Sequence, residues 1–589
     1  MKQILCIVAV VVCLHSESLH FFNRNIPQAA HVKMMSLQQK KLQVVAFSLN
    51  GWIIVTQDNE VFFENIPYDC EQQINQCSEK IRDIVFYPQD DGWVIITDTH
   101  FYSNNIPVAC REQLSRLFSQ SKSVHITFTR RGGWLVHNEK SFASHDFPED
   151  CLQVVLNFQQ GFRQPHHVVF FDEGWLVLAE DLYFASNIPQ ECYEQLQIFH
   201  QQGRLIHRVV STMENGWSMV ANTTSPKKDL HPSRQLENRA NIWRQMTDRN
   251  VRGLSIAVIV DNKIDWVCNY GVGDLATRRA VTNDTIFQAA SISKTFCALS
   301  VLYLVKHKQL SLDKNIGTYI SSRFVSHRKC VKKSSVNLRQ ILGHRSGIIG
   351  RGTTYPLDRC SGFNSDGGGF AGYQRNSSIP TIDSILLGHP NCNSPRVEFS
   401  YNANEVFSYS GAGYVVIQKI IENVTGMPYA LWTKERLLFE LGMNSSSFAI
   451  DIHQQFSEAR IASGYDFYGN EIDGKRRVYP ESTAAGLYTT TTDLAKMVIA
   501  INQKGRVGQE QLLNAQDVET MLQENLGIFT SGNANYLSFS HSGSNAGFKS
   551  LYYGFPYRKG GIVILSNSDG AADWLQELAN AIMSIYHWK

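Results

Sequence analysis

The sequence predicts an α+β protein in which a five-unit, β-rich repeat domain precedes a larger domain. The larger domain is expected to be an antiparallel sheet with flanking helices and a helical insertion. Three observations support this fold class: a Gly-Trp pair recurs through the first third of the chain, hairpin patterns lie at both ends of the remainder, and helical periodicities lie between them. At 589 residues the chain is too long for one ordinary core, so two or three domains are expected.

The repeat is defined by Gly-Trp pairs at spacings of 41, 41, 41 and 42 residues. An Asn-Ile-Pro motif or a variant of it lies between them, and proline is favoured at a helix start because its missing N–H costs nothing there. Each unit is therefore predicted to be a short helix plus a small antiparallel sheet, which cannot bury its apolar face alone. The repeated residues are Trp52, Trp93, Trp134, Trp175 and Trp217, and Pro27, Pro67, Pro107, Pro148 and Pro189.

The order of the fragments bears on how the array ends. The chain enters with a strand and Asn-Ile-Pro, and it leaves after "GWSMV" without another such motif. The first strand could therefore complete the last sheet and close a propeller-like ring, with an open solenoid as the alternative. No catalytic constellation falls here, so we expect an interaction module with a protein or glycan ligand.

Cysteines follow four of the repeat prolines at the same distance. Equivalent positions in different units should be far apart, and a disulfide needs Cα atoms within about 7 Å. No histidine or carboxylate recurs beside them, so a metal array is not expected. We predict buried thiols at Cys70, Cys110, Cys151 and Cys192.

The ends of the repeat region carry targeting and linker signals. "MKQILCIVAVVVCLHSES" has one lysine, a short apolar run and small residues, which predicts a signal peptide over residues 1–18 and a secreted or lumenal protein. Residues 19–222 form the repeats, and the polar, proline-containing segment 223–235 is the predicted linker to a domain at 236–589. No membrane span is expected after cleavage. Candidate N-glycosylation sites are Asn222, Asn283, Asn376, Asn423 and Asn444.

Composition excludes some functions. The formal net charge is +2 and no long basic run occurs, so nucleic acid is not an expected partner. No zinc-ligand spacing occurs either, so neither a metal nor another cofactor is predicted.

The larger domain carries a hairpin pattern at each end. An amphipathic helix is predicted over about 235–248, followed by a hairpin from Leu254 to Tyr270 around an Asp-Asn turn. A second hairpin pattern, "KSLYYGFPYRKGGIVILSNS", precedes a C-terminal helix. An antiparallel sheet built from both ends of the domain is the expected result.

Ser291 and Lys294 are the first candidate catalytic residues. Ser-x-x-Lys occurs at three other places in the chain, but only here does it open an apolar helix. Helix N-termini favour developing negative charge, and Lys294 would lie on the same helical face as Ser291. A lysine partly desolvated there can act as base toward the hydroxyl. The alternative is that Ser291 is only an N-cap.

Two further stretches favour catalysis. "FSYSGAGYVVIQKIIENVTG" places Tyr409 in a small-residue turn before a helix, and "FSHSGSNAGF" places His541 and Gly543 in a strand. With "ASISK", these motifs resemble in order and spacing the serine beta-lactamase-related family, which includes class C beta-lactamases, D-Ala-D-Ala carboxypeptidases, D-aminopeptidases and esterases. The resemblance covers about residues 236–589 and implies a beta-lactamase/transpeptidase-like fold.

The resemblance also implies roles for these residues. By this resemblance, Ser291 would correspond to the acylated nucleophile and Lys294 to its proton partner. Tyr409 would correspond to the residue that passes the proton to the leaving group. The backbone N–H groups of Ser291 and Ser544 would form the oxyanion hole, with Gly543 allowing the strand to approach the substrate.

Two departures from the family pattern bear on the substrate. His541 stands where many relatives have lysine, and Gly411 where beta-lactamases usually carry asparagine. The missing asparagine amide argues against beta-lactams as substrates more than it argues against hydrolytic activity in general. A secreted serine hydrolase acting on an ester, a short acyl peptide or a D-amino-acid peptide is expected. The alternative is an inactive binding protein whose repeats recruit partners.

A long stretch over 351–400, rich in Gly, Ser, Asn and Pro, is expected to form a functional wall or lid. A disulfide between Cys360 and Cys392 could staple it, with Cys330 as a rival partner. His344 could point into the cleft, although a structural role in its loop is the favoured interpretation.

Overall fold

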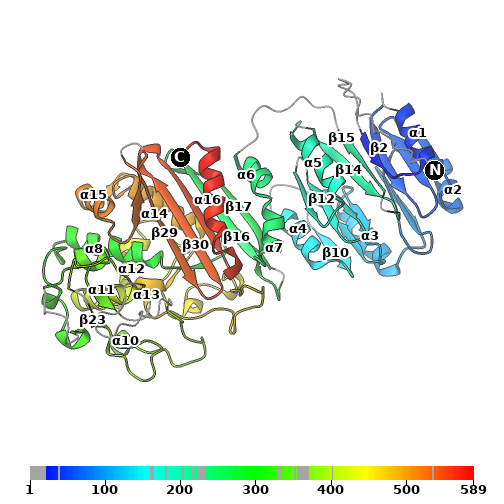
Figure 1. Cartoon of the computed structure of the whole chain (residues 1–589). Helices are drawn as coiled ribbons and strands as arrows, with labels where there is room; N and C mark the ends of the chain where they lie inside the picture. The colour runs from blue at the N-terminus through cyan, green and yellow to red at the C-terminus, as the bar shows by residue number, and fades with distance from the viewer. Residues whose placement is uncertain are drawn as a thin grey trace, which may run out of the picture. The chain divides into compact units, whose positions relative to one another are not determined.

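The computed structural model describes residues 21–588 apart from 38–39, 139–140, 160–164, 180–181, 202–203, 215, 222–231, 278, 328–334, 350–352, 355–369, 401 and 534–535. The chain divides into two compact units, Met1–Leu230 and His231–Lys589 (Figure 1). The predicted signal peptide and most of the predicted linker lie outside the described residues. Each unit is described by itself.

The first unit, called here the repeat unit, is built of three-stranded antiparallel sheets whose central strand begins at the repeated tryptophan. The first four sheets are β2 (Leu42–Phe47), β3 (Trp52–Thr56) and β4 (Val61–Glu64); β5 (Ile81–Phe86), β6 (Trp93–Thr97) and β7 (Phe101–Asn104); β8 (His125–Phe128), β9 (Trp134–His137) and β10 (Phe142–His145); and β11 (Pro165–Phe170), β12 (Trp175–Ala179) and β13 (Leu182–Ser186). The helices are α1 (Gln28–Ser36), α2 (Tyr68–Gln76), α3 (Val108–Gln120), α4 (Glu149–Gln159) and α5 (Gln190–Gln201). These small three-stranded sheets and short helices are consistent with the predicted β-rich repeat.

The last sheet is completed by the start of the chain. Its strands are β14 (Ile206–Ser211), β15 (Trp217–Ala221) and β1 (Phe21–Arg24), with β1 antiparallel to β15. The strands β2, β5, β8, β11 and β14, called here the inner strands, contact one another in that order, and β14 contacts β2. A hydrophobic cluster joins Val210 and Val220 of the fifth unit to Val45 and Ile54 of the first.

The Gly-Trp and Asn-Ile-Pro signatures have one common physical cause. The residue two before each helix-capping proline is Asn or Asp in the left-handed region, as at Asn65 with a φ of 52°. Its carbonyl lies against the glycine of a Gly-Trp pair, so that a Cβ added at Gly51 would lie 2.3 Å from Asn65 O. The same contact links the fifth unit to the first, because a Cβ at Gly216 would lie 2.1 Å from Asn25 O. Only glycine admits this approach.

The repeat cysteines are buried free thiols, as predicted. Burial raises the pKa of Cys70, Cys110 and Cys192 to about 12, which leaves them unreactive at neutral pH. Within the described ranges, no group of histidine, cysteine or carboxylate side chains has an arrangement suited to a metal ion.

The second unit contains a seven-stranded antiparallel sheet in the described part of the chain. Both predicted hairpins are confirmed, and they lie side by side at its centre. The spatial order is β18 (Arg279–Ala280), β17 (Lys263–Asp274), β16 (Gly253–Val260), β31 (Gly560–Ser566), β30 (Phe548–Phe555), β29 (Ser538–Asn545) and β28 (Phe529–Ser531). The Asp261-Asn262 turn has both residues at positive φ, as a tight hairpin requires.

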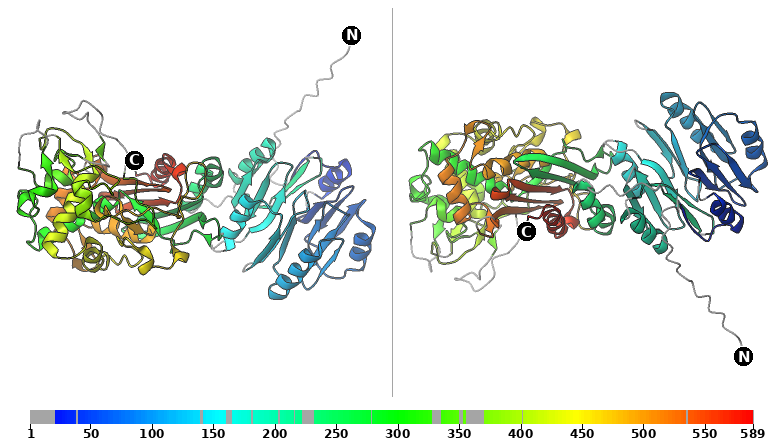
Figure 2. Two further views of the ribbon diagram at one scale, coloured as in Figure 1. Left: turned by 90° about the horizontal axis from the view of Figure 1, so that it is seen from below. Right: turned by 90° about the horizontal axis from the view of Figure 1, so that it is seen from above.

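Helices cover both faces of this sheet. One apolar cluster joins Ile256 and Ile564 to α6 (Pro232–Ala240), α7 (Ile242–Asp248) and α16 (Trp574–Ile585), and α16 runs alongside the strands in Figures 1 and 2. The neighbouring residues Ala257 and Leu565 belong to a second cluster with α8 (Ser293–Lys306) and α14 (Thr491–Asn502). The predicted helix over 235–248 is two helices, because Asn241 adopts a left-handed φ of 41° between them.

The remaining elements lie between the two hairpins. The helices are α9 (Leu338–Leu342), α10 (Ile382–Leu387), α11 (Gly411–Thr425), α12 (Tyr429–Thr433), α13 (Ser482–Ala485) and α15 (Ala515–Glu524). The short strands are β19 (Phe287–Ala290), β20 (Ser326–His327), β21 (Ile348–Ile349), β22 (Thr353–Thr354), β23 (Glu398–Phe399), β24 (Tyr409–Ser410), β25 (Leu487–Thr489), β26 (Arg506–Val507) and β27 (Glu510–Gln511).

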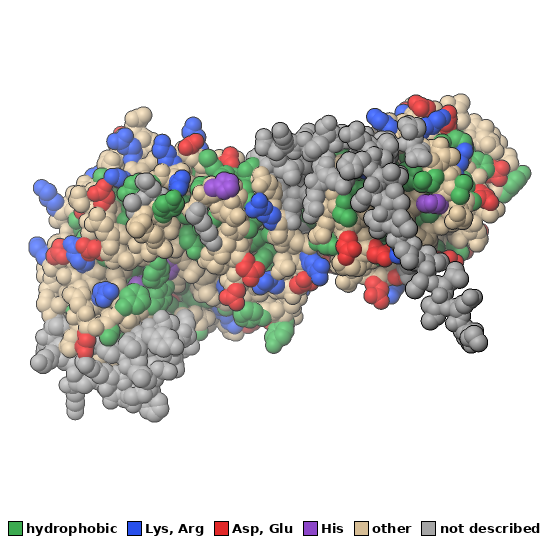
Figure 3. Space-filling view, turned by 45° about the horizontal axis from the view of Figure 1, so that its top comes forward, with side chains coloured by type: hydrophobic (Ala, Val, Ile, Leu, Met, Phe, Trp, Pro, Cys, Tyr) green, Lys and Arg blue, Asp and Glu red, His purple; other side chains and the backbone are tan. Residues whose placement is uncertain are grey.

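The surface carries mixed charge. On the face shown in Figure 3, basic and acidic side chains are interspersed. Four candidate glycosylation asparagines are exposed, namely Asn283, Asn376, Asn423 and Asn444, whereas Asn222 lies outside the described residues. Among the helices that the structure describes, none has the length and apolar character needed to cross a bilayer.

Candidate active site

Ser291 lies in the turn between β19 and α8 and is partly exposed. The N-cap position of α8 belongs to Ile292, which offers no side-chain hydrogen bond. Ser291 therefore does not act as the helix cap, which is the structural alternative to a catalytic role. The residue before it, Ala290, has a φ of 49°, a left-handed conformation that is costly for a residue with a Cβ. Such strain is common where a turn must present a reactive side chain.

Lys294 is the hydrogen-bond partner of the Ser291 hydroxyl. Lys294 Nζ lies 3.0 Å from Ser291 Oγ and donates to Ala484 O of α13 at 2.8 Å. The lysine is only 2% exposed, so its amine is held away from bulk water beside one hydroxyl and one carbonyl. A serine and a lysine in this arrangement can exchange a proton directly.

Tyr409 faces the same lysine from a different part of the chain. It lies in β24, and Lys294 Nζ is 5.0 Å from the centre of its ring. The next residue, Ser410, caps α11 by accepting from the Gly413 N–H at 3.0 Å. Helix α11 begins with the buried Gly411, so no side chain extends from this position toward the site.

His344 supports the Tyr409 turn. Its Nδ1 accepts the Ser410 N–H at 2.9 Å, and its ring lies 4.5 Å from the Tyr409 ring. The loop role favoured for His344 is therefore confirmed, but the loop residue is in direct contact with a candidate catalytic side chain. Burial, followed by repulsion from Lys294, holds the pKa of His344 well below its usual range. A neutral imidazole can accept this backbone hydrogen bond because its other nitrogen carries the proton.

Strand β29 brings the third motif to the same place. A Cβ added at Gly543 would lie 2.4 Å from Ala289 O, so the glycine lets β29 pass tightly against β19, just before Ser291. Ser544 is the next residue along β29 and is exposed. The glycine thus allows a close approach between two strands, and the predicted approach of β29 to the substrate stays a prediction.

His541 is buried beside Tyr409, with ring centres 6.2 Å apart. Its Nδ1 lies 2.6 Å from Ser542 O, so Nδ1 must carry the proton and Nε2 is left with a lone pair. Nε2 has no hydrogen-bond partner among the described residues. Burial, with repulsion from Lys294, lowers the pKa of His541 to about 3, so this histidine is neutral at physiological pH.

Two aromatic residues complete the cluster, and the sequence analysis did not identify either. Phe529 lies 5.3 Å from the His541 ring and 6.4 Å from the Tyr409 ring, and Phe407 lies 6.5 Å from Phe529. Phe407 is 47% exposed, which is unusual for a large apolar side chain beside a polar site. Phe529 comes from β28, far along the chain, and no local pattern connects it to the other motifs.

The described residues do not test the predicted disulfide. Cys392 is a half-buried thiol whose Sγ lies 3.7 Å from Asn391 Oδ1, and Cys360 and Cys330 lie outside the described residues. The Cys360–Cys392 pairing therefore stays a prediction.

A seven-stranded sheet flanked by helices, with a serine, a buried lysine and a tyrosine from a helical insertion, defines a serine hydrolase fold of the transpeptidase type. The model of the family described as Beta-lactamase matches residues 238–584. This chain belongs to that family, and the second unit, His231–Lys589, which contains the matched residues, is called here the hydrolase unit.

Relatives by sequence are distant. The chain is 24% identical over 331 residues to "Protein flp" of Staphylococcus aureus strain N315, covering 54% of this chain and 60% of that protein. It is 26% identical over 200 residues to "Penicillin-binding protein 4" of Amycolatopsis lactamdurans, covering 34% of this chain and 45% of that protein. The chain thus spans less than two thirds of the length of either relative.

Two solved structures each cover 60% of this chain. A penicillin-binding protein homologue from Pyrococcus abyssi, described as octameric, has a TM-score of 0.47 at 24% identity over 60% of this chain and 76% of that one. A beta-lactamase/D-alanine carboxypeptidase from Pseudomonas syringae has a TM-score of 0.45 at 20% identity over 60% of this chain and 98% of that one.

Proposed function

We propose that this protein is a secreted serine hydrolase that forms an ester on Ser291 and releases it to water. The observation that carries this proposal is the 3.0 Å contact between Lys294 Nζ and Ser291 Oγ at a buried lysine. The Beta-lactamase family assignment supports it. No cofactor is required for this chemistry.

In the proposed reaction, Ser291 Oγ attacks the substrate carbonyl and its proton passes to Lys294. The oxyanion is stabilised by the backbone N–H groups of Ser291 and Ser544, which lie on the two segments that Gly543 brings together. The proton then passes by way of Tyr409 to the leaving group as the carbonyl bond to that group breaks. Water then attacks the acyl ester, with the proton transfers running in the opposite direction, and the free hydroxyl of Ser291 is regenerated.

The proposed substrate class is an ester or a short acyl peptide, D-amino-acid peptides included, without a carboxylate beside His541. A substrate carboxylate needs a donor, and the lone pair on His541 Nε2 would repel it. Phe407 and Phe529 offer apolar surface next to the reacting groups, which suits an uncharged acyl or alcohol portion. Both features favour a neutral, partly apolar substrate.

For the repeat unit we propose a closed, propeller-like ring that binds a protein or a glycan. The pairing of β1 with β15 and the contact of β14 with β2 support closure over an open solenoid. The predicted signal peptide supports secretion, and the four exposed asparagines are accessible for glycosylation.

A fluorophosphonate probe tests the enzymatic proposal. The wild-type protein is expected to be labelled at Ser291, with labelling lost in Ser291→Ala. Label at another serine would overturn the mechanism, and a folded wild-type protein that takes no label would favour the inactive binding protein.

A further inference from the structure

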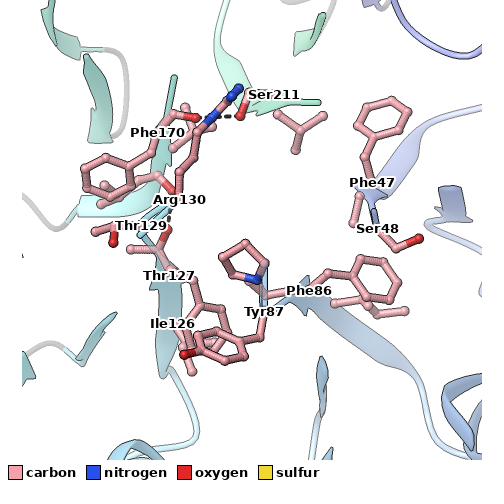
Figure 4. Close-up of a pocket in the computed structure, with 18 of the residues that line it drawn as sticks. Phe47, Ser48, Phe86, Tyr87, Ile126, Thr127, Thr129, Arg130, Phe170 and Ser211 are labelled. Atoms are coloured by element: carbon pink, nitrogen blue, oxygen red, sulfur yellow. Dashed lines mark hydrogen bonds between the residues drawn. The ribbon is translucent and has the colours of Figure 1, made fainter. Parts of the chain in front are cut away.

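The inner strands enclose two cavities that share lining residues. One, of about 130 Å³, lies toward the C-terminal ends of these strands, and Figure 4 shows Ser48, Phe86, Thr127, Phe170 and Ser211 around it, one from each unit. The other, of about 330 Å³, lies toward the N-terminal ends. His167 and Arg208 line both. The second cavity, called here the histidine cavity, has the size of a small-molecule site.

The histidine cavity is lined by polar side chains that differ from unit to unit. One position, opposite the third residue after each repeated tryptophan, carries Val44, Asp83, His125, His167 and Arg208 in the five units. The last four of these line the cavity, together with His166 and His207. At the position opposite the tryptophan itself, the residues are Phe47, Phe86, Phe128, Phe170 and Ser211. Four of the five units therefore share a phenylalanine at this second position, whereas the residues at the first position, which line the histidine cavity in four units, vary from unit to unit.

The carboxylate that lines this cavity is already engaged. Asp83 forms an ion pair with Arg208, and the two side chains are only 13% and 10% exposed. Asp83 Oδ1 also accepts the Ile84 N–H at 2.8 Å. Arg208 extends further to Val45 O at 3.4 Å. A cation entering the cavity would have to displace this pair, whereas an anion would meet Arg208, Arg82 and several imidazoles.

Burial keeps His125, His166 and His167 neutral, and a bound anion would oppose this effect. Burial lowers the pKa of His125 to about 4, an effect that Asp83 opposes and that Arg82 and Arg208 reinforce. Burial lowers the pKa of His166 to about 4 as well, with His125 and His207 adding repulsion. His167 donates from Nε2 to Val209 O at 2.6 Å, so its Nδ1 is an acceptor until it takes a proton. An anion beside these rings would favour the protonated forms.

We propose that the histidine cavity binds a small anion bearing a phosphate or carboxylate group, of about monosaccharide size, and that binding takes up protons. Arg82 and Arg208 provide two fixed positive charges, of which Asp83 balances one. The imidazoles provide charge that the ligand itself induces, and the amides of Gln43 and Gln57 can pair with hydroxyl groups. This site is independent of the proposed hydrolase chemistry.

Isothermal titration of the full-length protein tests the proposal, with inorganic phosphate, glucose 6-phosphate and glucuronate as probes and glucose as the uncharged control. Saturable binding is expected for at least one phosphate or for glucuronate, and not for glucose. Glucuronate keeps its charge under mild acid, so its affinity should rise about tenfold or more between about pH 7.5 and pH 5.5 as the imidazoles charge. The phosphate and carboxylate arms identify which group the cavity prefers.

Variants locate the binding. Arg208→Gln and His167→Gln should each weaken it by about tenfold or more, since each removes a charged hydrogen bond. Arg130→Gln is the matched control, because Arg130 also pairs with an aspartate, Asp172, but lines the other cavity. Ser291→Ala should bind as the wild type does. If Arg208→Gln fails to fold, His167→Gln carries the test alone.

Several outcomes would overturn the proposal. They are the absence of saturable binding for all three anions, equal binding of glucose, affinity that falls on acidification, and unchanged binding in His167→Gln. Loss of binding in Ser291→Ala would place the ligand in the catalytic cleft instead.

Discussion

In the hydrolase unit the candidate site combines single residues from distant parts of the chain, whereas the repeat unit presents each position five times. Ser291 comes from the turn before α8, Lys294 from α8, Tyr409 from the insertion and His541 from the sheet. In the repeat unit, the position opposite the tryptophan holds phenylalanine in four of the five repeats, whereas the position opposite the third residue after the tryptophan varies and lines the histidine cavity in four of them. Divergence between repeats is therefore a signal for a site, and a repeated motif alone is not.

The two units also treat buried histidines differently. His344 and His541 lie near Lys294, whose amine is bonded to the Ser291 hydroxyl and the Ala484 carbonyl. The histidines of the repeat unit lie near Arg208, whose charge is balanced by Asp83. Protonation of His344 or His541 would therefore place a second positive charge near the base Lys294. Protonation of the repeat-unit histidines would instead add positive charge beside an ion pair that is already balanced.

The largest expected effect is a loss of catalytic activity on substitution of two residues in the hydrolase unit. Ser291→Ala and Lys294→Ala should each lower kcat for a nitrophenyl ester by about a thousandfold or more, and the double variant should be no worse, because the two residues act as one unit. The melting temperature of the hydrolase unit should change little in Ser291→Ala. Additive losses in the double variant would contradict this shared role, and the measurement is steady-state kinetics beside calorimetry.

The second prediction concerns closure of the repeat unit. Gly216→Ala would place a Cβ 2.1 Å from Asn25 O, and the resulting shift should destabilise the repeat unit by about 1–3 kcal/mol without changing ester hydrolysis. Gly273→Ala is the control, because the nearest atom to its added Cβ is 3.4 Å away. Thermal unfolding followed by tryptophan fluorescence measures both. Unchanged stability in Gly216→Ala would mean that the chain start does not hold the fifth unit in solution.

The third prediction is that the repeat unit loses stability as the pH falls from about 7 toward 4. His125 and His166 have folded-state pKa values of about 4, below the ordinary value of 6.5. Between these values the unfolded chain binds protons that the folded chain does not, so stability falls on acidification and levels off below the folded pKa. Glucuronate should reduce the loss. A melting temperature that rises on acidification would contradict the assignment of neutral histidines.

The hairpins at both ends of the hydrolase unit were predictable from the sequence, and its motifs also led to Ser291, Lys294 and Tyr409, which lie close together in the structure. Periodicity and turn residues act locally, and the three motifs each lie within a short stretch. Phe529 and the contact of His344 with Tyr409 were not predictable, because they depend on how β28 and the α9 loop pack against the insertion. The break at Asn241 was also missed, since an amphipathic pattern continues through it.

The fourth prediction tests His344 as a positioning residue. His344→Leu removes the acceptor for the Ser410 N–H and should lower kcat about tenfold with little change in KM, since an unpaired buried N–H costs about 1–3 kcal/mol. His344→Asn keeps an acceptor and should recover part of the loss. Equal kinetics for the two variants, or a change confined to KM, would show that His344 does not act through Tyr409.

The last prediction concerns the substrate and the residue at Gly411, where the smallest change in activity is expected from a substitution. A nitrophenyl ester should have a kcat/KM about one to two orders of magnitude above that of a chromogenic cephalosporin, because the lone pair on His541 Nε2 offers no donor to the cephalosporin carboxylate. Gly411→Asn restores only one amide, and a single neutral hydrogen bond is worth about 0.5–1.5 kcal/mol, so cephalosporin turnover should improve by about tenfold at most. His541→Lys adds a fixed charge and should improve it further, with ester hydrolysis as the internal control. A wild-type preference for the cephalosporin would show that neither the neutral His541 nor the missing amide limits this site.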